Sequence, residues 1–340
     1  MNNFLAALVG ETHEEIPVWF MRQAGRYLPG YRGIRTRMSI REMCRDVDTT
    51  VAVTLEPVKS IGVDAAIIFA DIMLPVESMG FSLDFVEGVG PAISNPFKAN
   101  RSLSGISDFS LENYGYKTYD SIRRIRSSND SLPVIGFSGG PLTIASYLVN
   151  GRPDRDLAQT KELLLSGDRD FRNLLRMITE MVIMNSMEQI RSGASTVQIF
   201  DSWAGYLSPG QFSSYAENYL GEISSELNHH APLIYFSTQT SSMSDILVSA
   251  GFSFLSLDWR CNLHQVMEFL GGEVGLQGNL DPAIAEISRS AALEEGHRIA
   301  SSMSGFPRYI FNLGHGVLPG TNPETLKELV KAVHSIELKI

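Results

Sequence analysis

The chain has little cysteine. Among its 340 residues only Cys44 and Cys261 carry thiols, and neither lies in a Cys/His spacing that would hold zinc. Two cysteines so far apart also provide no disulfide framework of the kind that stabilises small secreted domains. The sequence therefore predicts a cytoplasmic protein, kept in a reducing compartment, with no metal bound through sulfur.

Positive charge and long apolar runs are also scarce. The formal net charge is −10, which disfavours nucleic acid and anionic membranes as partners because both need a positive contact surface. Apolar runs such as Ala65 to Ala70 fall well short of the roughly 20 residues that cross a bilayer. No Lys or Arg precedes Arg22, so we expect no signal peptide. We expect neither nucleic acid nor a membrane as a partner.

Several cofactor-binding motifs are missing as well. The chain has no Walker loop and no Gly-x-Gly-x-x-Gly turn, which argues against nucleotide and dinucleotide binding. None of its seven histidines is followed by another histidine four residues later, the spacing typical of zinc ligands on a helix. We therefore expect no metal ion and no organic cofactor.

The sequence does contain a repeated alternation of short apolar runs with longer segments of helical spacing. The apolar runs are continuously apolar, as is typical of parallel strands buried on both faces. Helices are expected within Ser39 to Ile61, Asp168 to Ser192, Pro209 to Asn228 and Pro282 to Met303. Eight strands are expected, at Val18 to Phe20, Ala65 to Ala70, Val134 to Ser138, Thr196 to Phe200, Leu233 to Phe236, Phe254 to Leu257, Val274 to Gln277 and Tyr309 to Leu313.

Strand followed by helix, repeated in this way, predicts an α/β protein whose parallel strands close into a single (β/α)₈ TIM barrel. A doubly wound open sheet is the alternative, but the glycine-rich turn that supports dinucleotide binding in such sheets is missing. No linker or shift in composition divides the chain, so residues 1–340 are expected to form one domain. Phe85 to Ile93, which contains Gly88, Gly90 and Pro91, is expected to form a small hairpin after the second strand.

Polar residues follow most of the expected strands. In a barrel the loops after the carboxyl ends of the strands build the active site, so we expect these residues to converge on one rim. They are Arg22, Arg26, Asp71, Asp201, Ser202, Ser237, Asp258, Asn279 and His315, and the turn Gly139 to Pro141 follows the third strand.

An arginine-rich segment follows the first expected strand. From Arg22 to Arg45 it contains seven arginines and a single acid, Glu42. Most of these arginines are expected on a solvated helix face. Arg22 and Arg26 differ because they flank Gln23 to Gly25, where small residues let the backbone approach a ligand. Guanidinium groups bind carboxylates and phosphates through paired hydrogen bonds, so the segment predicts a ligand with several such groups.

Four further residues are candidates for the site. Asp71 ends the most apolar run and could cap the next helix, but a carboxylate in apolar surroundings is costly without a cation or N–H donors, which favours a functional role. His315 lies between two glycines that permit a tight turn at the rim. Tyr147 could equally be a core aromatic, and Ser202 a helix cap.

Several strings of residues resemble one enzyme family. The run WFMRQAGRYLP, Trp19 to Pro29, is similar to the N-terminal signature of uroporphyrinogen decarboxylases. The resemblance covers nearly the whole chain. It continues, in the family's order, through Asp64 to Asp71, Gly139 to Thr143 with Tyr147, Phe200 to Gly205, Gln277 to Pro282 and Asn312 to Gly316.

That resemblance implies a (β/α)₈ barrel that forms a homodimer with facing clefts and acts in haem biosynthesis without cofactor or metal. It implies that the four acetate side chains of uroporphyrinogen III become methyls, giving coproporphyrinogen III and four CO₂. A substrate with so many carboxylates would also account for the arginine-rich segment.

The resemblance also implies which residues form the site. Two positions depart from the family's pattern: Gly30 stands where an acidic residue is expected, and Ile40 stands where many members have an aromatic near the pocket. The catalytic residues implied are Asp71, Arg22, Tyr147 and His315. The substrate-binding residues implied are Arg22, Gln23, Ala24, Gly25, Arg26, Asp71, Tyr147, Ser202 and His315.

The chemistry can be argued from the reaction itself. Loss of CO₂ from a pyrrole acetate leaves an electron pair that needs a sink, and protonation of the ring α-carbon makes an iminium-like cation able to accept it. Asp71 would stabilise that cation and bind the pyrrole N–H groups, and both interactions strengthen in a dry pocket. The proton donor stays open among Arg22, Arg26, Tyr147 and His315.

Two other functions stay open. Zinc-dependent methyltransferases of the corrinoid-linked type share this barrel but need a thiol-rich zinc site, typically His-x-Cys with a distant second Cys. Neither Cys44 nor Cys261 lies in such a pattern. A non-catalytic tetrapyrrole-binding protein is the third interpretation, and an assay for CO₂ release would distinguish it.

Overall fold

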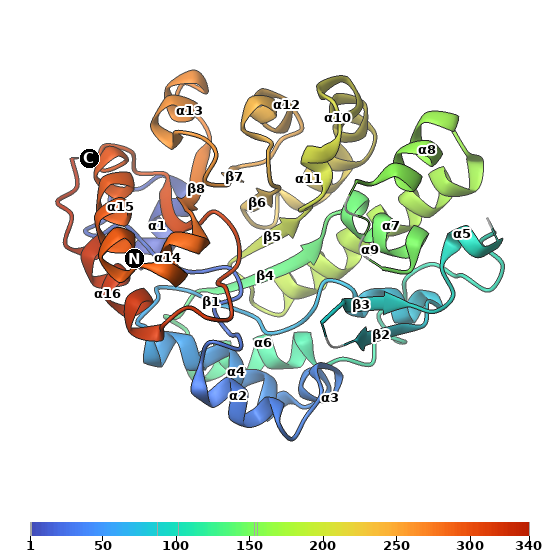
Figure 1. Cartoon of the computed structure of the whole chain (residues 1–340), viewed down its shortest axis with the longest axis horizontal. Coiled ribbons are helices and arrows are strands. Elements are labelled where there is room, and N and C mark those ends of the chain that lie inside the picture. Colours follow the sequence, from blue (N-terminus) through green and yellow to red (C-terminus); the bar gives the residue numbers. More distant parts are fainter. Residues whose placement is uncertain (1, 87, 101, 153, 155, 340) are drawn as a thin grey trace.

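A curled sheet of parallel strands forms the centre of the protein, described here from a computed structural model that covers residues 2–86, 88–100, 102–152, 154 and 156–339. Helices surround the sheet (Figure 1). In spatial order its strands are β1 (Ala66–Ile67), β4 (Val134–Gly139), β5 (Thr196–Phe200), β6 (Leu233–Phe236), β7 (Phe254–Ser256), β8 (Gly275–Leu280) and β9 (Tyr309–Leu313).

Helices and helical turns precede the first strand and separate most of the later strands along the chain. None of the helices in these residues is long and apolar enough to span a bilayer. They are α1 (Asn3–Val9), α2 (Pro29–Arg35), α3 (Ile40–Arg45), α4 (Val47–Ser60), η1 (Leu74–Met79), α5 (Phe97–Asn100), α6 (Thr118–Ser128), α7 (Pro141–Asn150), α8 (Ala158–Ser166), α9 (Arg169–Arg191), η2 (Ala204–Tyr206), α10 (Pro209–Tyr215), η3 (Ala216–Leu220), α11 (Gly221–Leu227), η4 (Ser241–Met243), α12 (Ser244–Ser249), α13 (Leu263–Phe269), α14 (Pro282–Ile287), α15 (Arg289–Ser302) and α16 (Pro323–His334).

Seven of the eight expected strands are confirmed as neighbours in one parallel sheet. The first expected strand is reduced to a single bridge between Val18 and Phe311 of β9. On one side of this segment the Phe311 N–H donates to Pro17 O at 2.9 Å, and on the other the Asp64 N–H donates to Val18 O at 2.8 Å. The sheet therefore has seven strands, and the Val18 segment lies between β9 and the residues that lead into β1.

Two of the expected helical segments are interrupted by a capping residue. In the segment Ser39 to Ile61, α3 ends and α4 begins at Asp46, whose carboxylate accepts the Thr49 N–H. Ser288 divides α14 from α15 in the same way, because its hydroxyl accepts the N–H of Ala291. A side chain that accepts these free N–H groups starts a new helix even where apolar spacing continues.

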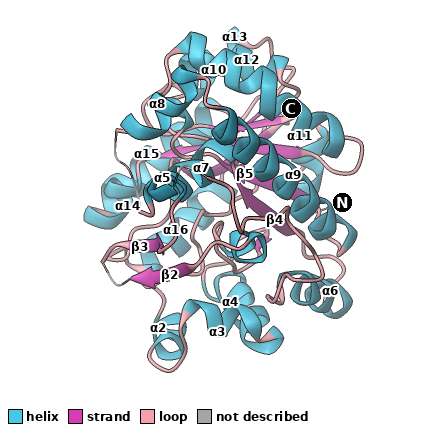
Figure 2. Ribbon diagram, turned by 90° about the vertical axis from the view of Figure 1, so that its right-hand side faces the viewer, coloured by secondary structure: helices cyan, strands magenta, loops and turns pink. Residues whose placement is uncertain are grey.

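The expected hairpin is confirmed. β2 (Leu83–Val86) and β3 (Gly90–Ile93) are antiparallel, with Val86 opposite Gly90. Figure 2 shows the pair lying apart from the central strands. The hairpin is therefore an insertion between β1 and β4 that does not extend the main sheet.

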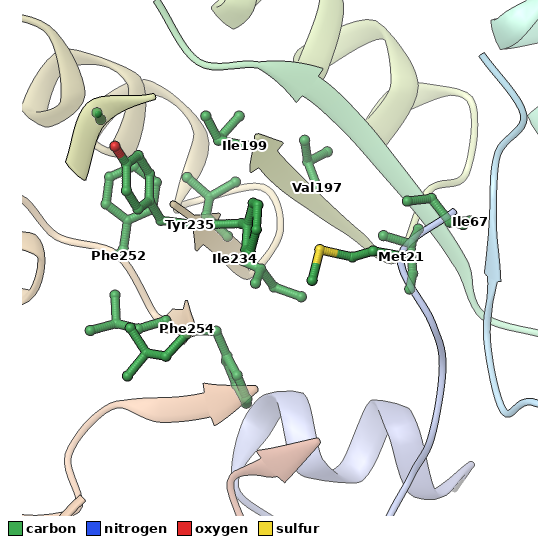
Figure 3. Close-up of a cluster of buried hydrophobic side chains, with 14 of the residues drawn as sticks. Met21, Ile67, Val197, Ile199, Ile234, Tyr235, Phe252 and Phe254 are labelled. Atoms are coloured by element: carbon green, nitrogen blue, oxygen red, sulfur yellow. The ribbon is translucent and has the colours of Figure 1, made fainter. Parts of the chain in front are cut away.

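Apolar side chains from neighbouring strands fill the interior. Trp19 lies among them and donates its Nε1–H to Gln277 Oε1 at 2.8 Å, while Gln277 Nε2 donates to Gln198 Oε1 at 2.9 Å. Buried amides are costly unless they are hydrogen-bonded, so this contact fixes the Trp19 segment against β5 and β8. Figure 3 shows the surrounding buried cluster, which includes Met21, Ile67, Val197, Ile199, Ile234, Tyr235, Phe252 and Phe254.

Candidate active site

A cavity opens at the carboxyl ends of the parallel strands. Its volume is about 980 Å³ with the open mouth included, and its position is where barrel enzymes build their sites. Of the expected site residues, Arg22, Ala24, Asp71, Tyr147, Ser202 and His315 line it, whereas Gln23, Gly25 and Arg26 do not. The other lining residues are Met21, Ile67, Ile68, Phe69, Ala70, Ile72, Pro91, Phe137, Phe200, Phe236 and Gly316.

Arg22 has a backbone conformation that is rare for any residue other than glycine. Its φ is +59°, a left-handed conformation that costs about 1–3 kcal/mol and persists only when the surroundings enforce it. The loop after β9 supplies that enforcement: the Val317 N–H donates to Met21 O at 2.9 Å, and a Cβ at Gly316 would collide with the Arg22 side chain. The loop after β9 thus directs an exposed guanidinium into the cavity.

Gln23 anchors the loop that carries Arg22 to the protein interior. Its side chain is fully buried, its Oε1 accepts the Phe20 N–H at 3.2 Å, and its Nε2 donates to Ala65 O at 3.1 Å. These bonds fasten the loop that carries Arg22 to the residues that lead into β1. In the free protein Gln23 therefore positions its neighbour and does not reach the cavity.

The arginines of the arginine-rich segment, Arg22 to Arg45, differ in their contacts. Arg32 donates to the carbonyls of Arg26 and Tyr27 at 2.9 Å, and Arg41 and Arg45 form ion pairs with Glu77. By contrast, Arg22 and Arg26 are exposed, and neither forms an ion pair with any residue that the structure describes. No described residue accepts a hydrogen bond from either side chain, so both guanidinium groups are available for an anionic ligand.

Asp71 follows β1, and its carboxylate both caps a turn and lines the cavity. Its Oδ1 accepts the Met73 N–H at 2.9 Å, so it caps the turn that leads into η1. It also lines the cavity among Ile68, Phe69 and Ile72. Burial raises the pKa of Asp71, while the Met73 N–H and the positive charge of Arg22 lower it. The result is a carboxylate in mostly apolar surroundings with a cation nearby.

Tyr147 reaches the cavity from α7, and Ser202 from the loop after β5. Burial, followed by the negative charge of Asp71, raises the pKa of Tyr147, and Arg22 opposes this effect. Tyr147 therefore keeps its proton at neutral pH and can donate a hydrogen bond. Ser202 is anchored through its backbone, because Thr238 Oγ1 donates to Ser202 O at 2.9 Å.

His315 is neutral at physiological pH. Burial first, and then the charge of Arg22, lower its pKa to about 4. Its Nδ1 accepts the Gly316 N–H at 2.7 Å, which places the single proton of the neutral ring on Nε2. His315 therefore presents an N–H donor, and the imidazolium form is scarce at pH 7.

An aromatic wall faces the charged residues, and no motif in the sequence predicted it. Phe137, Phe200 and Phe236 stand on β4, β5 and β6, with neighbouring ring centroids 5.6 and 5.7 Å apart and edge-to-face geometry. His315 continues the series, 5.6 Å from Phe236. The available signal was position, because each Phe lies at or near the carboxyl end of its strand. Such a wall suits flat, electron-rich rings.

Some of the polar residues expected at the rim are buried outside the cavity. Asp201 Oδ1 accepts the Thr143 N–H at 2.8 Å, and Oδ2 accepts the hydroxyls of Tyr215 at 2.6 Å and Tyr235 at 3.0 Å. This carboxylate therefore ties α7, which carries the cavity tyrosine, to the sheet. Ser237, Asp258 and Asn279 are likewise buried and lie outside the cavity lining.

The two departures from the family pattern have separate local explanations. Hydrogen bonds from the N–H groups of Gly30 and Tyr31 reach Glu56 of α4 and partly offset the burial that raises its pKa. A Cβ at Gly30 would collide with that carboxylate, so the negative charge at the start of α2 comes from another helix. Ile40 begins α3, packs against the core and is absent from the cavity lining.

Comparison with known proteins shows which family the chain belongs to. Residues 1–336 match the model of the family described as Uroporphyrinogen decarboxylase (URO-D). The uroporphyrinogen decarboxylase of Thermoplasma acidophilum is 43% identical over 99% of this chain and 100% of its own length, and that of Aquifex aeolicus is 38% identical over 98% of each. A solved methyltransferase from Methanosarcina mazei shares the fold, with a TM-score of 0.79, 19% identity and 97% coverage of each chain. The resemblance seen in the motifs is confirmed, and the chain belongs to the uroporphyrinogen decarboxylase family.

Proposed function

We propose that this chain removes CO₂ from the four acetate side chains of uroporphyrinogen III and so produces coproporphyrinogen III for haem biosynthesis. Membership of the family supports the substrate and the reaction. The observation that carries the proposal is Asp71, a carboxylate in an apolar cavity beside the guanidinium of Arg22. That arrangement suits a reaction in which positive charge develops on a ring that carries many carboxylates.

Substrate binding uses the two kinds of surface in the cavity. Arg22 inside the cavity and Arg26 outside its lining bind substrate carboxylates, and each charge-assisted contact contributes about 1.5–3 kcal/mol. The aromatic wall receives the pyrrole faces. Tyr147 and His315, both neutral, donate hydrogen bonds to substrate, and Ser202 adds a further hydroxyl.

The reaction consumes one proton for each acetate. A proton first adds to the ring α-carbon and makes an iminium-like cation. The bond to the carboxylate then breaks, CO₂ leaves, and its electron pair neutralises the cation. The exocyclic carbon next takes up a proton while the ring α-carbon loses one, which leaves a methyl group. Asp71 hydrogen-bonds the pyrrole N–H groups and stabilises the cation, an electrostatic contribution that is large in a water-poor site.

The decisive experiment is incubation of the protein with uroporphyrinogen III under anaerobic, reducing conditions, with products resolved by carboxylate number. We expect products that have lost carboxylates one at a time, down to the species in which all four acetates have become methyls, with one CO₂ released for each carboxylate lost. A folded protein that binds the substrate and returns it with every carboxylate intact would contradict the proposal and favour a tetrapyrrole-binding protein.

The architecture and assembly are further parts of the proposal. We infer that the Val18 segment acts as the eighth strand and closes a (β/α)₈ barrel, supported by its hydrogen bonds toward both sheet edges, and that residues 1–340 form one domain. The family resemblance supports a cytoplasmic homodimer with facing clefts and no metal or cofactor. Light scattering on the purified protein should give twice the chain mass, and a monomer at working concentration would contradict the dimer.

A further inference from the structure

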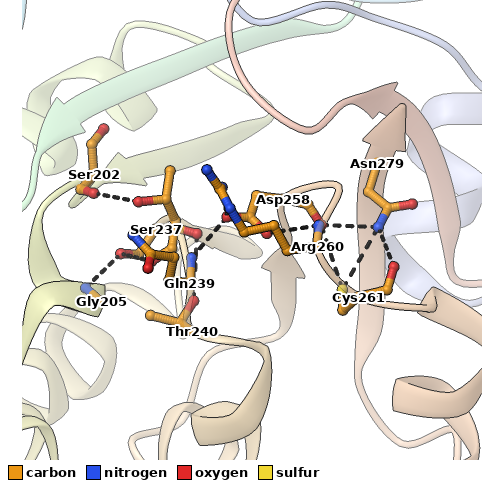
Figure 4. A network of polar contacts seen from close by, with 10 residues as sticks. Ser202, Gly205, Ser237, Gln239, Thr240, Asp258, Arg260, Cys261 and Asn279 are labelled. Carbon is orange, nitrogen blue, oxygen red and sulfur yellow. Dashed lines mark hydrogen bonds and ion pairs between the residues drawn. The ribbon is translucent and has the colours of Figure 1, made fainter. Parts of the chain in front are cut away.

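The loop that carries His315 lies against residues 258–260, which follow β7, and the loop that carries Ser202 is connected to the same residues through the loop after β6. Figure 4 shows the polar contacts of this segment with Gln239 in the loop after β6 and with Asn279 of β8, and the contacts between the loops after β5 and β6. Asp258 is at the centre of these contacts, and its side chain is 2% exposed. It is absent from the cavity lining, so its effect on the site has to pass through its neighbours.

The first contact fixes the loop after β6. Asp258 Oδ2 accepts the Gln239 N–H at 2.8 Å. Gln239 has a φ of +61°, which a residue with a side chain adopts only under constraint. The hydrogen bond from its own N–H to a buried carboxylate provides such a constraint. Asp258 therefore determines the course of the backbone at Gln239.

From Gln239 the connection continues to Ser202. The preceding residue, Thr238, donates its hydroxyl to Ser202 O at 2.9 Å, and the Gly205 N–H donates to Ser237 Oγ at 3.2 Å. A Cβ at Gly205 would overlap Thr238 O, so the two loops lie in close contact. A shift of the loop after β6 would consequently move Ser202.

The same segment also supports the loop of His315. Gly314 lies so close to this segment that a Cβ at Gly314 would be 2.6 Å from the backbone nitrogen of Trp259. The negative charge of Asp258 acts on His315 and opposes the effects of burial and of Arg22 on its pKa. Asn279, at the end of β8, donates Nδ2–H to Asp258 O at 2.9 Å and fixes the segment itself.

The Asp258 carboxylate is occupied by protein groups on several sides. Oδ2 also accepts the Arg260 Nη1–H at 2.7 Å, and Oδ1 accepts the Arg260 N–H at 3.1 Å. The Arg260 guanidinium lies over the Trp259 ring, 4.2 Å from its centroid. These contacts neutralise the buried charge and hold the segment rigid.

We propose that Asp258 is a positioning residue that sets the places of Ser202 and His315 on the cavity wall without contacting substrate itself. The inference rests on the proposed function, in which Ser202 and His315 contact the substrate. It assigns to this buried network a role in substrate affinity, which a purely structural ion pair would not have.

The kinetic test uses Asp258→Asn, which keeps the size of the side chain and removes its charge. We expect KM for uroporphyrinogen to rise about tenfold, the scale of one lost hydrogen bond, while kcat stays within about threefold because Asp71, which stabilises the developing charge, belongs to another loop. Combining the change with Ser202→Ala should give less than the sum of the two single effects, since both act at one contact. An unchanged KM in folded Asp258→Asn, or full additivity with Ser202→Ala, would overturn the proposal.

Two further variants distinguish the proposed role of Asp258 from a folding defect and from a general effect of replacing an aspartate. Thr238→Val breaks the contact with Ser202 O without touching the buried charge and should raise KM by a similar factor. If it does not, the route through Thr238 is wrong. Asp281→Asn is the matched control, because Asp281 follows the neighbouring strand and only accepts the Ala283 N–H that caps α14. Asp281→Asn should leave KM unchanged, and its effect should be additive with that of Ser202→Ala. If Asp281→Asn instead raises KM as Asp258→Asn does, the positioning role is not specific to Asp258.

A measurement on the free protein separates this inference from the proposed function. Amide hydrogen exchange at residues 202–205 and 237–240 should be faster in Asp258→Asn than in the parent. Adding Gln239→Gly should restore part of the protection, because glycine adopts positive φ without help. Exchange that does not change would overturn the inference even if the parent is an active decarboxylase. A parent without activity would instead defeat the proposed function, whatever the exchange shows.

Discussion

Two aspartates stand at opposite ends of the same strand region and have opposite surroundings. Asp64, before β1, accepts the Val18 N–H at 2.6 Å and a hydrogen bond from His334 Nε2 at 2.8 Å, both on Oδ2. Asp71, after β1, accepts the N–H of Met73, and among the described residues it forms no ion pair. Arg22 is near enough to lower its pKa but is not paired with it.

The difference indicates what each end of the strand is for. At the amino end, a carboxylate that bonds both the Val18 segment and α16 holds distant parts of the chain together. At the carboxyl end, the carboxylate of Asp71 and the guanidinium of Arg22 have no ion-pair partner among the described residues, which lowers stability and is useful only if a ligand supplies the missing partners. This matches the division in barrel enzymes between a stability face and a catalytic face.

The largest expected effect is at the end of the strand that borders the cavity. Asp71→Asn should lower kcat by on the order of a hundredfold or more, because stabilisation of a developing charge in a water-poor site is commonly worth several kcal/mol. KM should rise much less, and thermal stability should hold or increase as one costly buried charge disappears. Steady-state kinetics and a melting curve measure both. Turnover within a few-fold of the parent in a folded variant would make Asp71 merely a cap.

A smaller effect is expected from the free cation. Arg22→Ala should weaken substrate binding and turnover by a combined roughly 1.5–3 kcal/mol, or about ten- to more than a hundredfold in kcat/KM, with little loss of stability. Arg37→Ala is the control, since Arg37 is exposed and, among the residues that the structure describes, its side chain donates only to the nearby Gly33 O at 3.3 Å. Equal losses of kcat/KM in the two variants would mean that the arginines that bind substrate were wrongly identified.

Asp64→Asn tests the other end of the strand. The free energy of unfolding should fall by about 1–3 kcal/mol, because the Val18 N–H and His334 lose a charged acceptor. kcat and KM per folded molecule should stay close to those of the parent. Urea denaturation and kinetics on the same preparation test this, and a selective loss of kcat without loss of stability would erase the contrast with Asp71.

The smallest effect is a pH dependence of the contact made by His334. Burial alone would lower the pKa of His334, but its hydrogen bond to Asp64, the charge of Asp64 and that of Glu15 outweigh burial and raise it. The contact therefore contributes fully below the unfolded pKa of about 6.5 and is lost as pH rises through the higher folded pKa. Parent and His334→Gln should differ by about 1 kcal/mol at pH 6 and by less at pH 9 in urea denaturation. A difference that grows with pH would contradict this sign.

Much of the scaffold could be predicted because burial on both faces requires continuously apolar strands. Thr196–Phe200, Leu233–Phe236 and Tyr309–Leu313 were predicted with the bounds that the structure has. The breaks at Asp46 and Ser288 could not be predicted, because apolar spacing continues through them and only the geometry shows that these side chains cap a new helix.

The candidate site was predictable in its charged half and much less so in the rest. The order of the motifs identified Arg22, Asp71, Tyr147, Ser202 and His315, and all of them line the cavity. The aromatic wall could not be predicted, because a phenylalanine at a strand end is typical of an ordinary core residue. Only the curl of the sheet brings three such residues together.

By itself, the sequence determined the chemical types at the strand ends: arginines, a carboxylate after an apolar run, and glycines where close approach is needed. Only the tertiary structure decided which of those groups face the cavity. Asp201 and Asp258 follow strands just as Asp71 does, yet neighbouring hydroxyls, N–H groups and a guanidinium satisfy them. Whether a carboxylate is satisfied depends on donors brought near by distant segments of the chain, and spacing along one segment does not reveal them.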